Sequence, residues 1–239
     1  MTKEMKRRVQ RLEEEREQTT LASRLRNQPR VQEATRDTYT WVTQHTKTYN
    51  EHWQEEGRPD AFEPFPDASR YPHIPIVFAF IDSRRISLIE KSRDMMMSWA
   101  IVAYFTRHAM VVPQRGVLFQ TQKEAKVIQL LDYAKCLYEQ QPNWLKAAFP
   151  LAKPMKQQSA LCLQFAHGGY IRGLPGGANQ IRSFHPWGYL NDETAFQPYA
   201  GECYNEALSV VRGKIVFNSS AGPGWYADFK NDIVRSEES

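Results

Sequence analysis

The chain has 239 residues, a length that suits one large domain or two small ones and allows a buried core. Its 31 Lys and Arg against 27 Asp and Glu give a net charge of +4, which permits a polyanionic partner without requiring one. A hydrophobic content of 41% excludes wholesale disorder, and no apolar run approaches the roughly 20 residues of a membrane helix. The charged start differs from a signal peptide, and three scattered cysteines fit a reducing compartment. We expect a soluble, globular, cytoplasmic protein.

Residues 1–56 are predicted to form a helical segment that precedes the main domain. Residues 1–27 consist mostly of charged and amide side chains, which fits a solvated helix or a frayed arm. Apolar side chains then recur at helical spacing between residues 31 and 53, which predicts an amphipathic helix ending at Gly57. Five prolines within residues 58–75 predict an ordered, aromatic-rich loop without regular structure.

From residue 86 onward, short strands alternate with helices. The alternation predicts an α/β domain over residues 57–239, with a mainly parallel central sheet flanked by helices. Such sheets bind ligands at the carboxyl ends of their strands. Two glycine-rich segments, residues 167–170 and 175–177, are interpreted as hairpin turns. The expected strands are 86–90, 116–121, 160–166, 169–171, 189–191 and 214–218, and the expected helices are 98–105, 123–140 and 202–211.

The junction at residues 89–98 is a candidate phosphate-binding loop between a strand and a buried helix. In such a loop, backbone N–H groups lead into a helix N-terminus and together bind an anion. Lys91 would add a point charge for phosphates, and the Ser98 hydroxyl at the helix start would ligate Mg²⁺. The usual glycine-rich pattern is absent, because Met97 stands at the usual lysine position and Met96 at that of the second glycine. An ordinary turn whose methionines pack in the core is the alternative.

Two further strand ends carry polar pairs. Asp192 and Glu193 follow one predicted strand; the first carboxylate could hold Mg²⁺ and the second could polarise an attacking water. A surface turn is the alternative for this pair. Ser219 and Ser220 leave the last predicted strand, where a hydroxyl pair could sense the γ-phosphate. A glycine- and proline-rich turn that caps a helix is the alternative there.

In this order the segments resemble the N-terminal ATPase domain of tailed-phage terminase large subunits, the motors that package viral DNA. Residues 90–99 resemble that family's deviant Walker A loop, in which the lysine sits early. Residues 190–196 resemble its Walker B segment and catalytic glutamate, and residues 217–224 its coupling motif. The resemblance extends from about residue 71 to residue 229 and implies a P-loop NTPase fold that binds ATP and Mg²⁺.

The resemblance also implies roles for individual residues. Lys91 would contact phosphate, and Arg93 would lie beside the γ-phosphate. Ser98 and Asp192 would hold Mg²⁺, and Glu193 would act as the catalytic base. The nucleotide-binding loop as a whole would consist of Lys91, Ser92, Arg93, Asp94, Met95, Met96, Met97 and Ser98.

Further implied roles concern coupling and neighbouring subunits. Ser219 and Ser220 would couple hydrolysis to movement. Arg182 matches an arginine that some family members use as a finger toward a neighbouring subunit, with Arg172 as the alternative. The aromatic loop at residues 58–75 would flank the adenine.

The implied partners are double-stranded DNA, bound without sequence specificity, and further copies of the chain in a ring on a portal. A small terminase subunit is another candidate partner, and no membrane is expected. The protein would be found in the host cytoplasm and transiently on the procapsid. The family's C-terminal nuclease domain has no room in 239 residues, so we expect the chain to be part of a longer protein and to lack nuclease activity.

Two functions therefore fit the sequence. The first is a motor ATPase that hydrolyses Mg-ATP to translocate double-stranded DNA. The second is a non-catalytic module whose degenerate loop serves structure or nucleotide-dependent assembly, because Met96 replaces a glycine that lets backbone approach phosphate. A helicase-like ATPase would keep a lysine directly before Ser98. The six histidines lack zinc-ligand spacing, and no serine-hydrolase elbow is present.

Overall fold

A six-stranded sheet organises the computed structural model, which describes residues 3–237. The strand order is β3-β8-β7-β4-β6-β5, and all neighbours pair in parallel except β5, which is antiparallel to β6. The mainly parallel sheet predicted from the sequence is confirmed. The strands are β3 (Ile86–Glu90), β4 (Gly116–Gln120), β5 (Cys162–Gln164), β6 (Tyr170–Leu174), β7 (Gly188–Asp192) and β8 (Lys214–Ser219).

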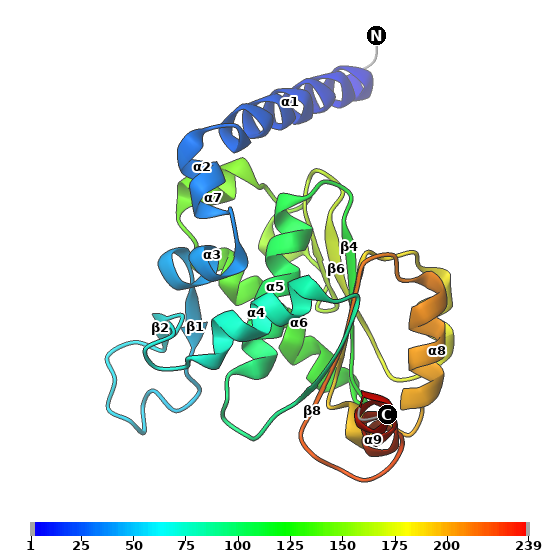
Figure 1. The fold of residues 1–239 in the computed structure, drawn as a ribbon. Helices are drawn as coiled ribbons and strands as arrows, with labels where there is room; N and C mark the ends of the chain where they lie inside the picture. Colours follow the sequence, from blue (N-terminus) through cyan, green and yellow to red (C-terminus); the bar gives the residue numbers. More distant parts are fainter. Residues whose placement is uncertain (1–2, 238–239) are drawn as a thin grey trace.

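Helices cover both faces of this sheet (Figure 1). Neighbouring residues of β7 and β8 point to opposite faces, so Leu190 and Val216 join one hydrophobic cluster while Tyr189 and Phe217 join another. Because these strands are buried on both faces, their sequences are nearly continuous apolar runs. The first cluster lies under α4 (His73–Ser83), α5 (Met97–Val111) and α6 (Glu124–Gln140), and the second under η2 (Ala178–Ser183), α8 (Ala200–Val210) and α9 (Trp225–Glu237).

The N-terminal part begins with a long helix, α1 (Lys3–Arg26), which extends away from the sheet (Figure 1). Its C-terminal end contacts the body of the protein: Ala22 is buried there and Leu25 packs against the first cluster. Of the two forms expected for the N-terminal segment, the helix is the one observed. The other short elements are α2 (Pro29–Ala34), α3 (Thr38–His45), β1 (Lys47–Tyr49), β2 (Phe62–Pro64), α7 (Asn143–Ala148), η1 (Met155–Gln157) and η3 (Thr194–Phe196).

The single helix predicted between residues 31 and 53 is wrong. The chain instead forms α2, α3 and β1 over this stretch. Asp37 interrupts the helix because its side chain accepts a hydrogen bond from Thr40 N at 2.7 Å, which starts a new helix at Thr38. The apolar spacing is nevertheless used, since Val31, Ala34 and Val42 are all buried in the first cluster.

The loop predicted at residues 58–75 is also partly wrong. Phe62–Pro64 form β2, which pairs antiparallel with β1, and α4 begins at His73. Pro75 is compatible with α4 because the first turn of a helix needs no intrahelical N–H donor there. Helices α4, α7 and α9 were not predicted from the sequence.

The turn at residues 167–170 joins β5 to β6 as a hairpin, with Gly168 at φ +88°, and is confirmed. The hairpin predicted at residues 175–177 is wrong, because this segment leads from β6 into η2. It is fixed instead by Gln120, whose Nε2 donates to the backbone oxygens of Pro175 and Gly177.

The division into residues 1–56 and 57–239 stays a prediction; β1 and β2 pair across that boundary. Within residues 3–237, no helix is long and apolar enough to cross a bilayer.

The packing of β7 against α5 and α6 generates a stability prediction. Leu190 is fully buried in the first cluster, so Leu190→Ala should lower the free energy of unfolding by about 2–5 kcal/mol through lost contacts and a residual cavity. Ile76→Ala, at a side chain that is 66% exposed, is the control and should change it by less than about 0.5 kcal/mol. Urea unfolding measures both, and equal effects would contradict the assigned orientation of β7.

Candidate functional site

Three strand ends meet at one edge of the sheet. β8 lies between β3 and β7, so the parallel register places Glu90 beside Ser219 and Asp192 beside Asn218. The backbone N–H of Lys91 donates to Ser219 O at 2.9 Å, which extends the β3–β8 pairing into the loop. The structure therefore brings together the phosphate-loop, acidic and serine segments that lie far apart in the sequence.

The loop between β3 and α5 turns through two left-handed residues, Asp94 at φ 61° and Met96 at φ 53°. Met96 is the N-cap of α5, a position where glycine would adopt this conformation without strain. Met97 is buried in the core, while Met95 holds the loop to α4 because its carbonyl oxygen lies 2.9 Å from His73 Nε2. The methionines thus pack as the ordinary-turn alternative requires, within a loop that still leads into a helix N-terminus.

The two predicted metal ligands are joined directly. Ser98 Oγ donates to Asp192 Oδ2 at 2.9 Å, and Asn218 Nδ2 donates to the other oxygen, Oδ1, at 2.5 Å. Asp192 is only 5% exposed, and burial, the largest influence, raises its pKa although the bonds from Asn218 and Ser98 lower it. A buried carboxylate of this kind is costly without a cation.

The donor set fits a Mg²⁺ ion. It combines a hydroxyl and a carboxylate, which are oxygen ligands that Mg²⁺ accepts. Asn218 Oδ1 is also buried and has no hydrogen-bond partner among the described residues, so the site has unused acceptor capacity. Asn218 is not among the site residues predicted from the sequence; its signal there is an amide in an otherwise apolar strand, directly before Ser219.

Lys91 and Glu193 form an ion pair across the site. Lys91 Nζ donates to Glu193 Oε1 at 3.2 Å, and the lysine side chain is 12% exposed against 39% for the glutamate. Glu193 adopts the left-handed conformation at φ 56°, which ends β7 and begins η3. Lys91, the candidate phosphate ligand, and Glu193, the candidate base, are therefore paired with each other in this structure.

The coupling candidates differ in their contacts. Ser219 is buried, and its Oγ accepts a hydrogen bond from Ala195 N at 3.0 Å, just after Glu193. Ser219 is thus bonded both to the loop at Lys91 and to the segment that follows Glu193. Ser220 follows β8 and is half-buried. Ser92, Arg93 and Asp94 are exposed at the front of the loop.

A cavity of about 270 Å³ opens beside the acidic residues. Its lining includes residues that were not predicted from the sequence, namely Thr121 just after β4 and several residues of α6. Among them is Tyr133, whose pKa is raised to about 12 by burial and then by the charges of Glu51 and Asp192. The sequence placed Thr121 only within an expected strand and the others only within the expected helix 123–140. The lining residues are Ser98, Thr121, Lys126, Gln129, Leu130, Tyr133, Asp192 and Glu193.

A second hollow of about 410 Å³ shares Gln129 and Tyr133 with the first. Aromatic rings line it, including Trp99, which stacks on Tyr133 with ring centroids 4.0 Å apart. Phe62 from the proline-rich segment also lines this hollow. The other two aromatic residues of that segment lie elsewhere: Phe65 is buried in the core and Tyr71 packs edge-on against His73. The predicted adenine contact stays a prediction.

The two arginine candidates lie on other parts of the molecule. Arg182 on η2 is 63% exposed and donates to Glu206 Oε1 on α8 at 2.5 Å. Arg172 on β6 lies over the ring of Phe184 at 5.1 Å. Both contact residues on the α8 side of the sheet, so a role toward a neighbouring subunit stays a prediction.

A mainly parallel sheet flanked by helices, with a loop that leads from β3 into α5 and an acidic pair at the end of β7, is the α/β architecture that the sequence predicted. No protein-family model and no curated protein sequence matches the chain. Among solved structures, an ATPase-domain mutant of the Thermus phage P74-26 large terminase aligns with a TM-score of 0.50 and 13% identity, covering 77% of this chain and 74% of that one.

The large terminase of bacteriophage HK97 aligns with a TM-score of 0.58 and 11% identity, covering 85% of this chain. The chain spans 42% of that protein's length. At these identities the likeness establishes the fold alone. The resemblance seen in the sequence is therefore confirmed as a shared fold: this chain folds like the ATPase domain of phage large terminases.

The raised pKa of Asp192 predicts how stability depends on pH. Folding favours the protonated form of the Asp192 carboxyl. The stability that this preference contributes is fully present below the unfolded-state pKa of 3.8, and it is lost as the pH rises through the higher pKa of the folded state. Asp192→Asn should therefore increase the free energy of unfolding at about pH 7, and the gain should shrink toward about pH 3. Urea unfolding across this range, without Mg²⁺, is the measurement.

The matched control is Asp132→Asn on α6, at a carboxylate whose side chain is 62% exposed. It should leave stability nearly unchanged over the same range. A loss of stability in Asp192→Asn at neutral pH would show that the hydrogen bonds to the carboxylate outweigh its burial.

Proposed function

We propose that the chain is the ATPase motor domain of a viral DNA-packaging terminase, which hydrolyses Mg-ATP to translocate double-stranded DNA into a procapsid. The observation that carries the proposal is the pairing of Ser98 with Asp192 beside the pairing of Lys91 with Glu193. The terminase ATPase fold supports it, because this site lies where strand ends meet in front of α5.

ATP binding would exchange the partner of Lys91. The ammonium would leave Glu193 for the phosphates, and Ser92, Arg93 and Asp94 are exposed in the same loop. Mg²⁺, held by Ser98 and Asp192, would neutralise phosphate charge. Release from Lys91 leaves the Glu193 carboxylate free to orient and deprotonate water, so the base becomes active only when nucleotide is bound.

Ser219 offers a route from hydrolysis to movement. It accepts backbone hydrogen bonds from Lys91 and Ala195, so rearrangement of either segment changes its contacts. Ser220 and the glycine-rich turn then lead into α9, which is tied back to the site because Lys230 Nζ donates to Glu90 Oε2 at 2.6 Å. The rest of the molecule would thereby sense the loss of phosphate.

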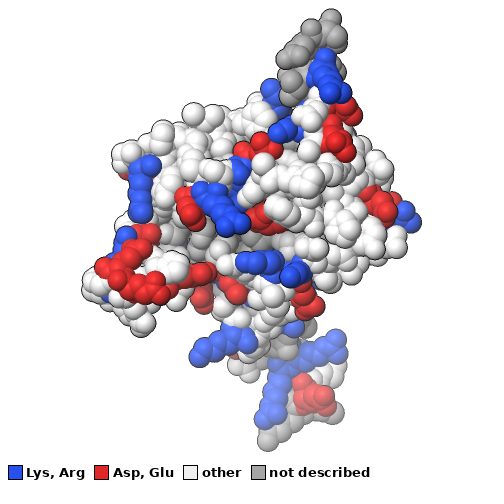
Figure 2. Space-filling model, turned by 90° about the horizontal axis from the view of Figure 1, so that it is seen from below, with Lys and Arg blue, Asp and Glu red and all other residues white. Residues whose placement is uncertain are grey.

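The wider assembly is part of the proposal. Arg182 would reach the nucleotide site of a neighbouring subunit in a homo-oligomeric ring on a portal. An arginine finger of this kind can raise the rate of hydrolysis by a factor of about 10³–10⁵. Lys and Arg would contact DNA phosphates without sequence specificity. Figure 2 shows basic and acidic side chains intermingled on the face seen from below, which suits a few DNA contacts per subunit. A small terminase subunit and a C-terminal nuclease domain would be further partners. The motor would be found in the host cytoplasm and transiently on the procapsid.

Lys91→Ala tests nucleotide binding. It should weaken Mg-ATP binding at least about tenfold, or about 1.4 kcal/mol, because it removes the charge that contacts phosphate. Isothermal titration calorimetry measures the affinity, since binding does not require a neighbouring subunit. Lys146→Ala is the control, because it also removes a lysine whose ammonium donates a hydrogen bond, here to the backbone oxygen of Glu139, but this lysine lies on α7.

Two results would contradict the binding proposal. Equal affinities of the unmodified chain and Lys91→Ala would remove Lys91 from the site. Absence of Mg-ATP binding by the unmodified chain would favour the non-catalytic assembly module, with Met96 closing the loop.

Glu193→Gln separates binding from hydrolysis. It should retain Mg-ATP binding, because Lys91 is released from its ion pair, while phosphate release at saturating Mg-ATP falls about 10²–10⁴-fold. Glu202→Gln, at an exposed residue on α8, should hydrolyse ATP at the unmodified rate. Unchanged hydrolysis by Glu193→Gln would exclude it as the base.

A further inference from the structure

An apolar stripe runs along the part of α1 that projects from the body. Val9 and Leu12 are 40% and 53% exposed although both are large aliphatic side chains. The stripe consists of Met5, Val9 and Leu12, at spacings of four and three residues, and the polar residues Arg16 and Thr19 continue the same alternation. This is the spacing at which one helix face packs against a second helix in a coiled coil.

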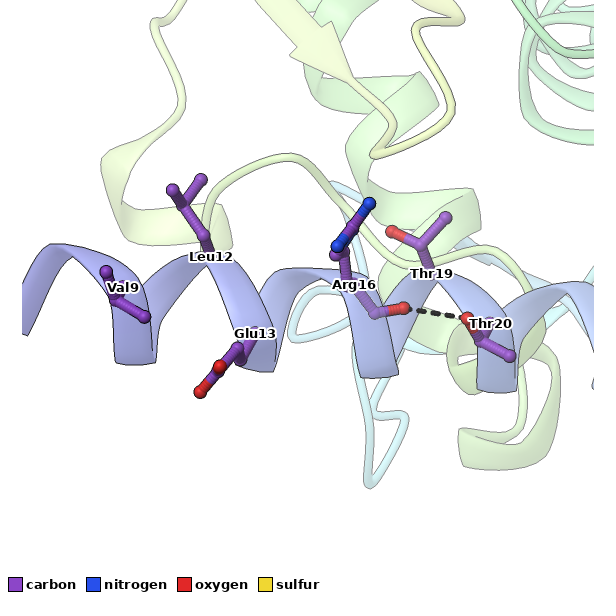
Figure 3. A pocket seen from close by; sticks show the side chains of 6 residues that line it. All are labelled: Val9, Leu12, Glu13, Arg16, Thr19 and Thr20. Atoms are coloured by element: carbon purple, nitrogen blue, oxygen red, sulfur yellow. Dashed lines mark hydrogen bonds between the residues drawn. The ribbon is translucent and has the colours of Figure 1, made fainter.

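A hollow of about 580 Å³ lies along the same stripe (Figure 3). Leu12, Arg16 and Thr19 project to the same side of α1 in this view. The described residues that line the hollow all belong to α1, and at the C-terminal end of the stripe Thr19 also lines a small hollow with Pro150, Ala166 and His167 of the body. The lining residues are Val9, Leu12, Glu13, Arg16, Thr19 and Thr20.

Opposite charges flank the stripe in two separate blocks. Residues 6–8 are Lys-Arg-Arg and residues 13–15 are Glu-Glu-Glu, both within α1. Arg7, Arg8, Glu13 and Glu14 are exposed. The blocks are centred seven residues apart, about 10 Å along the helix axis, so they do not pair with each other within one helix, although Arg11 and Arg16 stand three or four residues from members of the acidic block.

The charges of two α1 helices are complementary when the helices pack side by side in antiparallel orientation. If Val9 of one copy faces Leu12 of the other, the basic block of each copy faces the acidic block of its partner, twice by symmetry. Parallel pairing in register would set basic against basic and acidic against acidic, which is repulsive.

We propose that α1 is a self-association surface, on which α1 of a second copy of this chain packs antiparallel with Val9 opposite Leu12. The apolar seam is short, so the contact is weak and depends on salt, since exposed ion pairs are screened over about 8–10 Å at physiological ionic strength. The proposal is independent of the nucleotide site.

The test uses two charge-reversed variants of the chain. One replaces the basic block (Lys6→Glu, Arg7→Glu, Arg8→Glu), and the other replaces the acidic block (Glu13→Lys, Glu14→Lys, Glu15→Lys). Sedimentation equilibrium at low salt should show the unmodified chain moving toward twice its monomer mass with concentration. Each variant alone should lose this association, because like charges then face each other, and their equimolar mixture should recover it.

Two further samples keep the result interpretable. Lys153→Glu with Lys156→Glu reverses exposed charges outside α1 and should associate like the unmodified chain. A variant with both blocks reversed restores complementarity and should also associate, so loss of the helix cannot account for the single-block results. An unmodified chain that stays monomeric, a single-block variant that associates normally, or a mixture that fails to recover would each overturn the proposal.

Discussion

The site depends on one constraint, the burial of a carboxylate where three parallel strands end. Asp192 is nearly inaccessible, and its two oxygens accept hydrogen bonds from Ser98 and Asn218. Those donors come from α5 and β8, so the bonds fix the start of the helix relative to β7 and β8. Lys91 and Ser219 are then held in place by the pairing of β3 with β8. Displacement of any of these strands would separate the groups on which the proposed chemistry depends.

Two polar groups at the end of β7 and β8 are buried in unfavourable surroundings. Burial raises the pKa of Asp192, and Asn218 Oδ1 is left without a partner among the described residues. Lys91 meanwhile neutralises Glu193 rather than a ligand. A bound cation would satisfy the first pair of groups and an anion would attract the lysine. Under the proposed function, a metal–phosphate complex would satisfy both groups at once.

The sequence predicted the sheet segments well because strands buried on both faces are apolar and end at charged or glycine residues. It failed for residues 31–53, where the Asp37 cap ends one helix and starts another, and for residues 58–75, where β1 supplies the hydrogen bonds of β2. Residues 91, 98, 192 and 219 could be selected because each follows a strand or starts a helix. Thr121 and Tyr133 could not, since only packing against other elements places them at the site.

By itself the sequence determined the alternation of strands and helices, the order of the polar segments and the complementary charge blocks of α1. These are local properties of spacing and composition. The tertiary structure decided which strands are neighbours, and hence that residues about 100 positions apart form the Lys91–Glu193 pair. It also decided the burial of Asp192, because the pKa of a carboxyl depends on what surrounds it in space.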